Sequence, residues 1–130
     1  MSAPTVTRIA VAVVSHQGRY LVGQRPGGVP LEGLWEFPGG KVLSGEEPAA
    51  AACRECREET GLAVTVRDEY PAVEHHYPHG RLHLRFFACA PSDPTATPNA
   101  PFVWVRAAEL ARLEFPPANQ ALIARLTAGA

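Results

Sequence analysis

The sequence predicts an α/β fold in which a mixed β-sheet lies between helices. Short apolar runs rich in β-branched residues recur along the chain, as expected of buried strands. Two segments of helical composition accompany them, one in the middle of the chain and one at its end. At 130 residues, a division into two units would leave each with too small a core. We therefore expect one domain over residues 1–130.

The first third of the chain contains two paired strands, a loop and a short strand. Arg8–Val14 is a continuous apolar run of the buried type. His16–Arg19 predicts a hairpin turn into a second strand at Tyr20–Gln24. The Gly- and Pro-rich segment Arg25–Gly33 predicts a loop. Leu34–Phe37 then predicts a short strand that a Pro-Gly-Gly sequence ends.

The middle of the chain contains the strongest helix signal. Pro48 suits the first helical position, where its missing N–H costs nothing. Four alanines follow, and Gly61 is a natural C-terminal stop. Strands are expected at Val64–Tyr70 and at Arg81–Cys89, where apolar and polar residues alternate.

The end of the chain returns to the sheet and closes with a helix. Ala90–Pro101 contains four Pro and predicts a loop. Phe102–Val105 predicts the last strand, and Asn119–Leu126 an amphipathic helix. The complete order is consistent with strands enclosed by two helices.

Composition excludes several classes of partner. A formal net charge of −1 provides no basic field for polymeric nucleic acid, although a small nucleotide remains compatible. No stretch approaches the roughly 18 to 20 apolar residues of a membrane span. Three cysteines without framework spacing favour a reducing cytoplasm, and Cys53 and Cys56 are expected to be buried thiols rather than half of a metal site. We expect a monomer or homodimer.

Three glutamates in the predicted helix suggest a metal site. Glu55, Glu58 and Glu59 stand at i, i+3 and i+4, so they project from one helix face. Their mutual repulsion would become an attraction for a divalent cation, and carboxylate oxygens suit Mg²⁺ or Mn²⁺ rather than Zn²⁺. The alternative is a solvated acidic face. Arg54, at i, i+4 to Glu58, is placed to steady the cluster, and the glycine at position 40 permits tight backbone approach.

The complete pattern from Gly40 to Leu62 resembles the Nudix box, G-x5-E-x7-R-E-U-x-E-E-x-G-U, where U is a bulky aliphatic residue. Cys56 departs from it, but a small hydrophobe should still pack at that position. The resemblance implies a Nudix αβα sandwich and metal-dependent hydrolysis of a nucleoside diphosphate linked to another group. It also implies that Glu46 supports the loop through Arg54. The implied metal ligands are Glu55, Glu58, Glu59 and the carbonyl of Gly39.

The implied chemistry is in-line substitution at phosphorus by a water that the metal ion orients. Glu55 and Glu58 are the candidates for accepting the proton of that water. Relatives of the MutT type often have a further Glu on the loop before the late Trp-containing strand. Residues 97–104 contain no acid here, and Asp93, the nearest, is not assigned a role. The identity of the base therefore stays open.

Two segments outside the box indicate the substrate. Trp35–Lys41 is similar to the approach segment of MutT-like pyrophosphohydrolases, in which Lys41 would contact phosphate. Phe115–Asn119 resembles the MutT segment whose Asn recognises the purine base, and an amide suits that role because it both donates and accepts. The alternative is that Asn119 caps the last helix.

The implied reaction converts a (deoxy)nucleoside triphosphate and water into the monophosphate and pyrophosphate, with 8-oxo-dGTP as a plausible substrate. Cytidine or other pyrimidine triphosphates remain alternatives. So does ADP-ribose, because some enzymes for it have a Pro about sixteen residues after the box, where Pro78 stands. A non-catalytic binding module is less consistent, because such modules lose box glutamates that are present here. A domain detached from a larger DNA-repair enzyme is disfavoured by the fit of one domain to the chain.

Four histidines, at positions 75, 76, 79 and 83, lie within nine residues. They have neither a paired Cys nor a His-Glu-x-x-His helix, so we do not expect a metal site there. His83 and Arg85 share one strand face. They are predicted either to line the nucleotide cleft or to face solvent.

Overall fold

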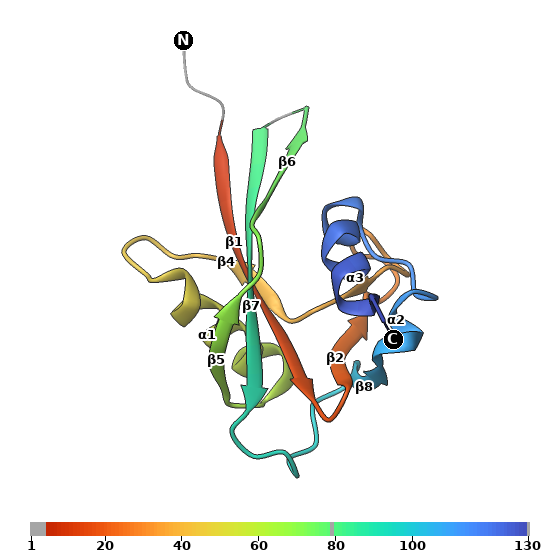
Figure 1. Cartoon of the computed structure of the whole chain (residues 1–130). Coiled ribbons are helices and arrows are strands. Elements are labelled where there is room, and N and C mark those ends of the chain that lie inside the picture. The colour runs from red at the N-terminus through yellow and green to blue at the C-terminus, as the bar shows by residue number, and fades with distance from the viewer. Residues whose placement is uncertain (1–4, 79, 130) are drawn as a thin grey trace.

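The computed structural model describes residues 5–78 and 80–129, in which an eight-stranded mixed sheet has helices on both faces (Figure 1). The elements in chain order are β1 (Val6–His16), β2 (Arg19–Gln24), β3 (Trp35–Glu36), β4 (Gly39–Lys41), α1 (Pro48–Thr60), β5 (Val64–Glu69), β6 (Val73–Tyr77), β7 (Gly80–Pro91), β8 (Phe102–Arg106), α2 (Ala107–Leu110), the 3₁₀ helix η1 (Pro117–Asn119) and α3 (Gln120–Thr127).

The two longest strands, β1 and β7, form the centre of the sheet. They run parallel, in register from Val6 opposite Arg81 to Val14 opposite Cys89. On its other side β1 pairs antiparallel with β4, and its last residues form a hairpin with β2. The other edge of β7 pairs antiparallel with β5 and β6, while β2 also pairs with β3 and β8. The predicted mixed sheet is confirmed.

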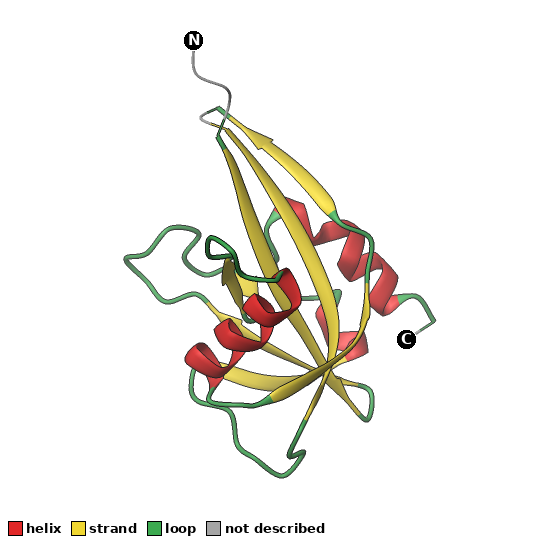
Figure 2. Cartoon of the chain, turned by 90° about the vertical axis from the view of Figure 1, so that its left-hand side faces the viewer, coloured by secondary structure: helices red, strands yellow, loops and turns green. Residues whose placement is uncertain are grey.

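The core has two layers because successive side chains of a strand point to opposite faces. Ala10, Ala12 and Val14 of β1 belong to a cluster that includes the buried face of α1. Val11 and Val13 belong to a second cluster that includes the buried residues of α2 and α3. Figure 1 shows α1 on one side of β1 and β7 and the other helices opposite, and Figure 2 shows α1 in front of the strands. This is the expected αβα sandwich.

Helix α1 begins and ends as the sequence predicts. Pro48 occupies its first turn, and Gly61 ends it with a left-handed φ of 79° and an N–H that donates to the carbonyl of Arg57. The small side chains of Ala52 and Cys56, both fully buried, allow the helix to lie close on the sheet. Cys56 therefore fills the aliphatic position of the box, as expected. Glu55 and Glu59 lie on the adjacent side of the helix, which faces Gly39 and Gly40 of β4.

Three features differ from the predicted elements. The segment after Phe37, expected to end a strand, forms β4, because the pairing of Gly39–Lys41 with β1 overrides the low strand propensity of glycine. Helix α2 was not expected. Asn119 belongs to η1, so α3 begins one residue later, at Gln120.

Two further findings bear on the predicted environment. None of the helices described by the structure is both long and apolar enough to cross a membrane. The three cysteines are free thiols, with Cys56 and Cys89 buried and Cys53 half-buried. Burial raises the pKa of all three thiols, and that of Cys89 to about 12.

Candidate functional site

Arg54 ties the glutamates of α1 to the preceding loop. Its Nε donates to Oε2 of Glu46 at 2.8 Å and its Nη2 to Oε1 of the same residue at 3.1 Å. Its Nη1 lies 3.0 Å from Oε1 of Glu55 and 3.2 Å from Oε2 of Glu58. Nη2 also donates to the carbonyl of Lys41. The hydrogen bonds from Arg54 lower the pKa of Glu46, and one guanidinium thus bridges the loop and the helix.

Glu59 is the most perturbed acid of this helix. The N–H of Gly39 donates to its Oε2 at 2.9 Å, which lowers its pKa. Burial has the larger, opposite effect, and the charges of Glu36, Glu55 and Glu58 add to it, so the pKa of Glu59 rises to about 7. A half-buried carboxyl surrounded by other carboxylates is therefore a place where a cation would be stabilised.

Gly39 and Gly40 bring the backbone of β4 against α1. A Cβ on Gly40 would lie 2.6 Å from both carboxylate oxygens of Glu55, so the approach requires glycine. Gly39 lies opposite Val11, between backbone hydrogen bonds from Ala12 and Val42. Both its N–H and its C=O consequently point away from β1, on the side where the N–H meets Glu59.

These residues fit a hard divalent cation by their chemistry. Three carboxylates and an outward-pointing carbonyl provide the oxygen ligands that Mg²⁺ and Mn²⁺ prefer. Burial, with the added charges of Glu36, Glu55 and Glu58, raises the pKa of Glu59, so a cation beside this carboxylate would be stabilised. Across residues 5–78 and 80–129, no three His, Cys, Asp or Glu side chains converge closely enough to coordinate an ion as they stand. Arg54 holds Glu55 and Glu58 in this structure.

A cavity of about 690 Å³ lies beside the two glycines, in the size range of small-molecule sites. Both Gly39 and Gly40 line it, so its wall is continuous with the backbone that contacts Glu55 and Glu59. Most of the remaining wall is apolar. The lining residues include Ile9, Val11, Leu31, Phe37, Leu82, Leu84 and Pro116.

Asn119 lines the same cavity, although it is far from the two glycines in the sequence. The residue is 8% exposed. It occupies the N-cap position of α3, yet its side chain makes no capping hydrogen bond. Phe115 stacks on Phe37, with ring centroids 5.2 Å apart, and this contact fixes the segment that leads to Asn119. The geometry therefore does not support capping as the role of the Asn119 amide, and leaves that amide at the cavity.

The structure does not bring His83 and Arg85 to this cavity. Leu82 and Leu84 line it, so His83 and Arg85 point to the opposite face of β7. Arg85 forms two hydrogen bonds of 2.8 Å with Glu69 and lies over the ring of Phe87. Neither residue is therefore placed to bind a substrate in this cavity.

Lys41 and the other histidines differ from His83 and Arg85 in where they lie relative to the cavity. Lys41 is exposed and lies opposite Ile9, which lines the cavity. His75 lines the cavity, whereas Pro78 does not. The described histidines belong to no metal-binding group, and His79 lies outside the described residues.

Two charged residues of the cavity wall were missed by sequence reasoning. Glu36 and Arg25 line the wall and form an ion pair with 2.6 Å between Oε2 and Nη1. Glu36 also raises the pKa of Glu59, which places its charge near α1. Its position in the approach segment before the box is the signal that could have found it. Asp93 of the late loop instead accepts hydrogen bonds from Thr95 and does not line the cavity.

Comparison with known proteins agrees with this geometry. A family model for the NUDIX domain matches residues 9–125. The chain is 29% identical over 122 residues to the 8-oxo-dGTP diphosphatase of Escherichia coli (strain K12), covering 92% of this chain and 95% of that protein. It is 42% identical over 77 residues to the CTP pyrophosphohydrolase of the same organism, covering 58% and 56%.

A solved structure extends the likeness to the whole fold. The solution structure of the DNA mismatch repair protein MutT from methicillin-resistant Staphylococcus aureus 252 superposes with a TM-score of 0.78 at 27% identity. It covers 98% of this chain and 100% of that one. The chain therefore belongs to the Nudix hydrolase family, in its MutT-like group, and is an enzyme that acts on pyrophosphate bonds.

Proposed function

We propose that this protein hydrolyses purine nucleoside triphosphates, 8-oxo-dGTP among them, to the monophosphate and pyrophosphate in a reaction that requires Mg²⁺ or Mn²⁺. One observation carries the proposal: the buried amide of Asn119 and the backbone of Gly39–Gly40 line the same cavity. A base held at Asn119 would direct its phosphates along that wall toward the glutamates of α1. The 8-oxo-dGTP diphosphatase that matches nearly the whole chain supports this substrate.

Some residues of the site would bind the nucleotide, and others position the carboxylates for the reaction. Asn119 would hydrogen-bond the base edge as both donor and acceptor, within an apolar wall that favours a flat ring. Lys41, opposite a residue of the cavity wall, would contact the phosphates. Gly40 lets Glu55 approach the backbone, and Glu46 fixes Arg54 in place.

The carboxylates of α1 would hold the ion. Glu55, Glu58 and Glu59, with the carbonyl of Gly39, supply its oxygen ligands. A bound divalent ion would neutralise the phosphate oxygens and lower the pKa of a water molecule. Glu55 or Glu58 would accept the proton of the attacking water, and Arg54, which contacts both, keeps them beside each other.

A cytidine triphosphate is the second candidate substrate. The observation that favours it is the higher identity, 42%, to the CTP pyrophosphohydrolase, although that likeness covers only 58% of this chain. The aligned part does not span the whole cavity wall, which runs from Ile9 to Asn119. We therefore place the purine triphosphate first.

A nucleotide panel tests the proposal. The folded protein is incubated with 8-oxo-dGTP, dGTP, CTP and ADP-ribose, each with Mg²⁺, with Mn²⁺ and with a chelator, and the products are separated by chromatography. We expect the monophosphate and pyrophosphate from 8-oxo-dGTP and no product with the chelator. Preferred cleavage of CTP would replace the purine proposal with the second candidate. Turnover of none of the four would reject both.

The free state of all three cysteines also supports the predicted location in a reducing compartment such as the cytoplasm. We further propose, as the sequence predicts, that the protein acts as a monomer or homodimer, without polymeric nucleic acid as a partner. Size-exclusion chromatography with light scattering tests the first part of this proposal.

A further inference from the structure

A second cavity lies at the other end of the sheet from the β6–β7 turn. It has a volume of about 380 Å³, and its walls come from the β1–β2 turn, the loop before β8, and β8 itself. Its lining residues are His16, Gln17, Arg19, Pro94 and Trp104. None of them lines the large cavity beside Gly39 and Asn119, and none belongs to α1.

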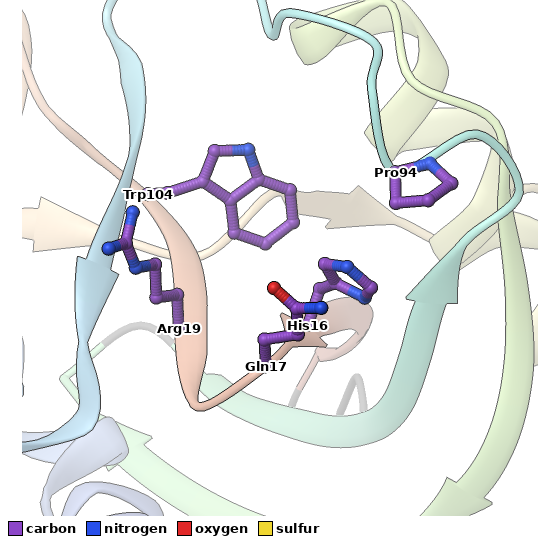
Figure 3. A pocket seen from close by; sticks show the side chains of 5 residues that line it. All are labelled: His16, Gln17, Arg19, Pro94 and Trp104. Atoms are coloured by element: carbon purple, nitrogen blue, oxygen red, sulfur yellow. The ribbon is translucent and has the colours of Figure 1, made fainter.

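The side chains around this cavity come from one face of the sheet. His16 lies opposite Arg19 in the hairpin, and Arg19 lies opposite Arg106 of β8. Trp104, two residues before Arg106, points to the same face. Figure 3 shows the Trp104 indole and the Pro94 ring beside the hollow, with His16 and Gln17 below them and Arg19 next to the indole. An aromatic surface is therefore combined with basic groups.

The charges on this face are unbalanced. Arg19 and Arg106 stand directly across from each other, an arrangement of like charges that destabilises a strand pair. Within the part of the chain that the structure describes, neither guanidinium has a carboxylate oxygen within 4.0 Å, and Glu109 instead accepts the backbone N–H of Arg106 at 3.3 Å. The lining residues contribute no acid. An anion bound here would convert the repulsion into two attractive contacts.

The hairpin turn holds Gln17 in an uncommon conformation. The two turn residues, Gln17 and Gly18, have φ values of 50° and 76°, which a two-residue turn of this kind requires. Glycine adopts a positive φ freely, whereas glutamine does so at a cost. The result is an amide side chain at the cavity, next to His16.

We propose that the cavity bounded by His16, Arg19 and Trp104 binds a planar heteroaromatic ring that carries a phosphate group, as in a nucleoside monophosphate. The ring stacks on the indole of Trp104, the kind of contact that binds bases without sequence preference. The phosphate lies between Arg19 and Arg106, and the Gln17 amide bonds the ring or the sugar. This site is separate from the one in which hydrolysis is proposed.

Nuclear magnetic resonance titration of the ¹⁵N-labelled full chain with GMP, without divalent metal, tests the proposal. The chain has two tryptophans, so the Trp35→Phe variant assigns the indole signal of Trp104. We expect the Trp104 indole N–H and the amides of Gln17 and Arg19 to shift together and to saturate at millimolar GMP. Shifts confined to residues of the large cavity would overturn the proposal.

Variants and partial ligands identify which contacts bind. Arg19→Gln removes an exposed side chain and should weaken GMP binding at Trp104 by about tenfold, the loss of one charge-assisted contact. The matched control is Arg112→Gln, an exposed arginine elsewhere, which should leave the affinity unchanged. Unchanged affinity in Arg19→Gln would contradict the phosphate contact.

Guanosine and ribose 5-phosphate test the two halves of the ligand. Each should bind at Trp104 at least about tenfold more weakly than GMP, because each keeps only one of the two contacts. Ribose 5-phosphate that binds as tightly as GMP would overturn the stacking role of Trp104. Asn119→Ala should leave the affinity reported by Trp104 unchanged, which separates this site from the proposed substrate cavity.

Discussion

On one side of Gly39–Gly40, the glutamates of α1 and their partners Arg54 and Glu46 come from the short segment between Lys41 and Thr60. On the other side, the cavity wall is gathered from β1, the Arg25–Leu31 loop, β6, β7 and the segment before α3. The first side is dense in carboxylates that Arg54 ties together, and the second is largely apolar, with the Asn119 amide and the Arg25–Glu36 ion pair as polar groups. In the proposed function, the first side carries out the hydrolysis and the second side selects the nucleotide.

The largest expected effect falls on the carboxylate side. Glu58→Gln should lower kcat by about 10²-fold or more, because it removes a candidate metal ligand and proton acceptor. The matched control is Glu47→Gln, an exposed glutamate just before α1 that makes no capping hydrogen bond, which should change kcat by less than about twofold. Steady-state kinetics on the preferred nucleotide measure both. A near-normal rate in Glu58→Gln would place the metal elsewhere.

A substitution at Gly40 affects the border between the two sides. In Gly40→Ala the added Cβ would lie 2.6 Å from the Glu55 oxygens and displace that carboxylate. We expect kcat to fall by about 10-fold to 10²-fold with the fold retained, since small misplacements of catalytic groups are costly. In the control Gly27→Ala, the new Cβ meets Glu32 at an ordinary 3.5 Å, and activity should persist. Equal activity in the two variants would contradict the close approach of Glu55.

A smaller and different effect is expected on the cavity side. Asn119→Ala should reduce the ratio of kcat/KM between the preferred nucleotide and its competitors by about tenfold. The variant should still hydrolyse the triphosphate. Arg112→Gln, at an exposed residue that does not line the cavity, is the control. Competition assays with pairs of nucleotides give the ratio directly. An unchanged ratio in Asn119→Ala would remove this residue from base recognition.

The smallest effect is a pH dependence of stability in the metal-free protein. The pKa of Glu59 is about 7 in the folded chain and near its ordinary value of 4.5 in the unfolded chain. Between these values the folded state binds more protons, so the free energy of unfolding should fall as pH rises from about 4.5 to about 7. Thermal melts across this range should show the decline, and Glu59→Gln should flatten it. A decline of equal size in Glu59→Gln would assign it to other groups.

The same contrast explains what the sequence could predict. The box, the helix from Pro48 and its stop at Gly61 are local patterns, and the structure confirms the helix and the contacts of Arg54. The strands of the central sheet were expected because their apolar runs are continuous or alternate. These features depend on spacing along the chain, which the sequence states directly.

Features that depend on distant segments were harder to predict. β4 exists because β1 provides its backbone partners, and nothing in a pair of glycines indicates a strand. The face of β7 that meets the cavity is the one with Leu82 and Leu84, so His83 and Arg85 point away from it. The alternating pattern of β7 does not specify which of its two faces meets the cavity, because this depends on the helices that cover each face. The Arg25–Glu36 pair likewise joins two segments that the fold brings together.

The most direct test is a crystal structure of the protein with Mg²⁺ and a non-hydrolysable triphosphate, dGTP with an imido group between its α and β phosphorus atoms. We expect the base against Asn119, the phosphates passing Gly39 and Gly40, and the ion held by Glu55, Glu58 and Glu59. A nucleotide bound in the same cavity with its phosphates directed away from α1, or an ion held by other residues, would contradict this expectation.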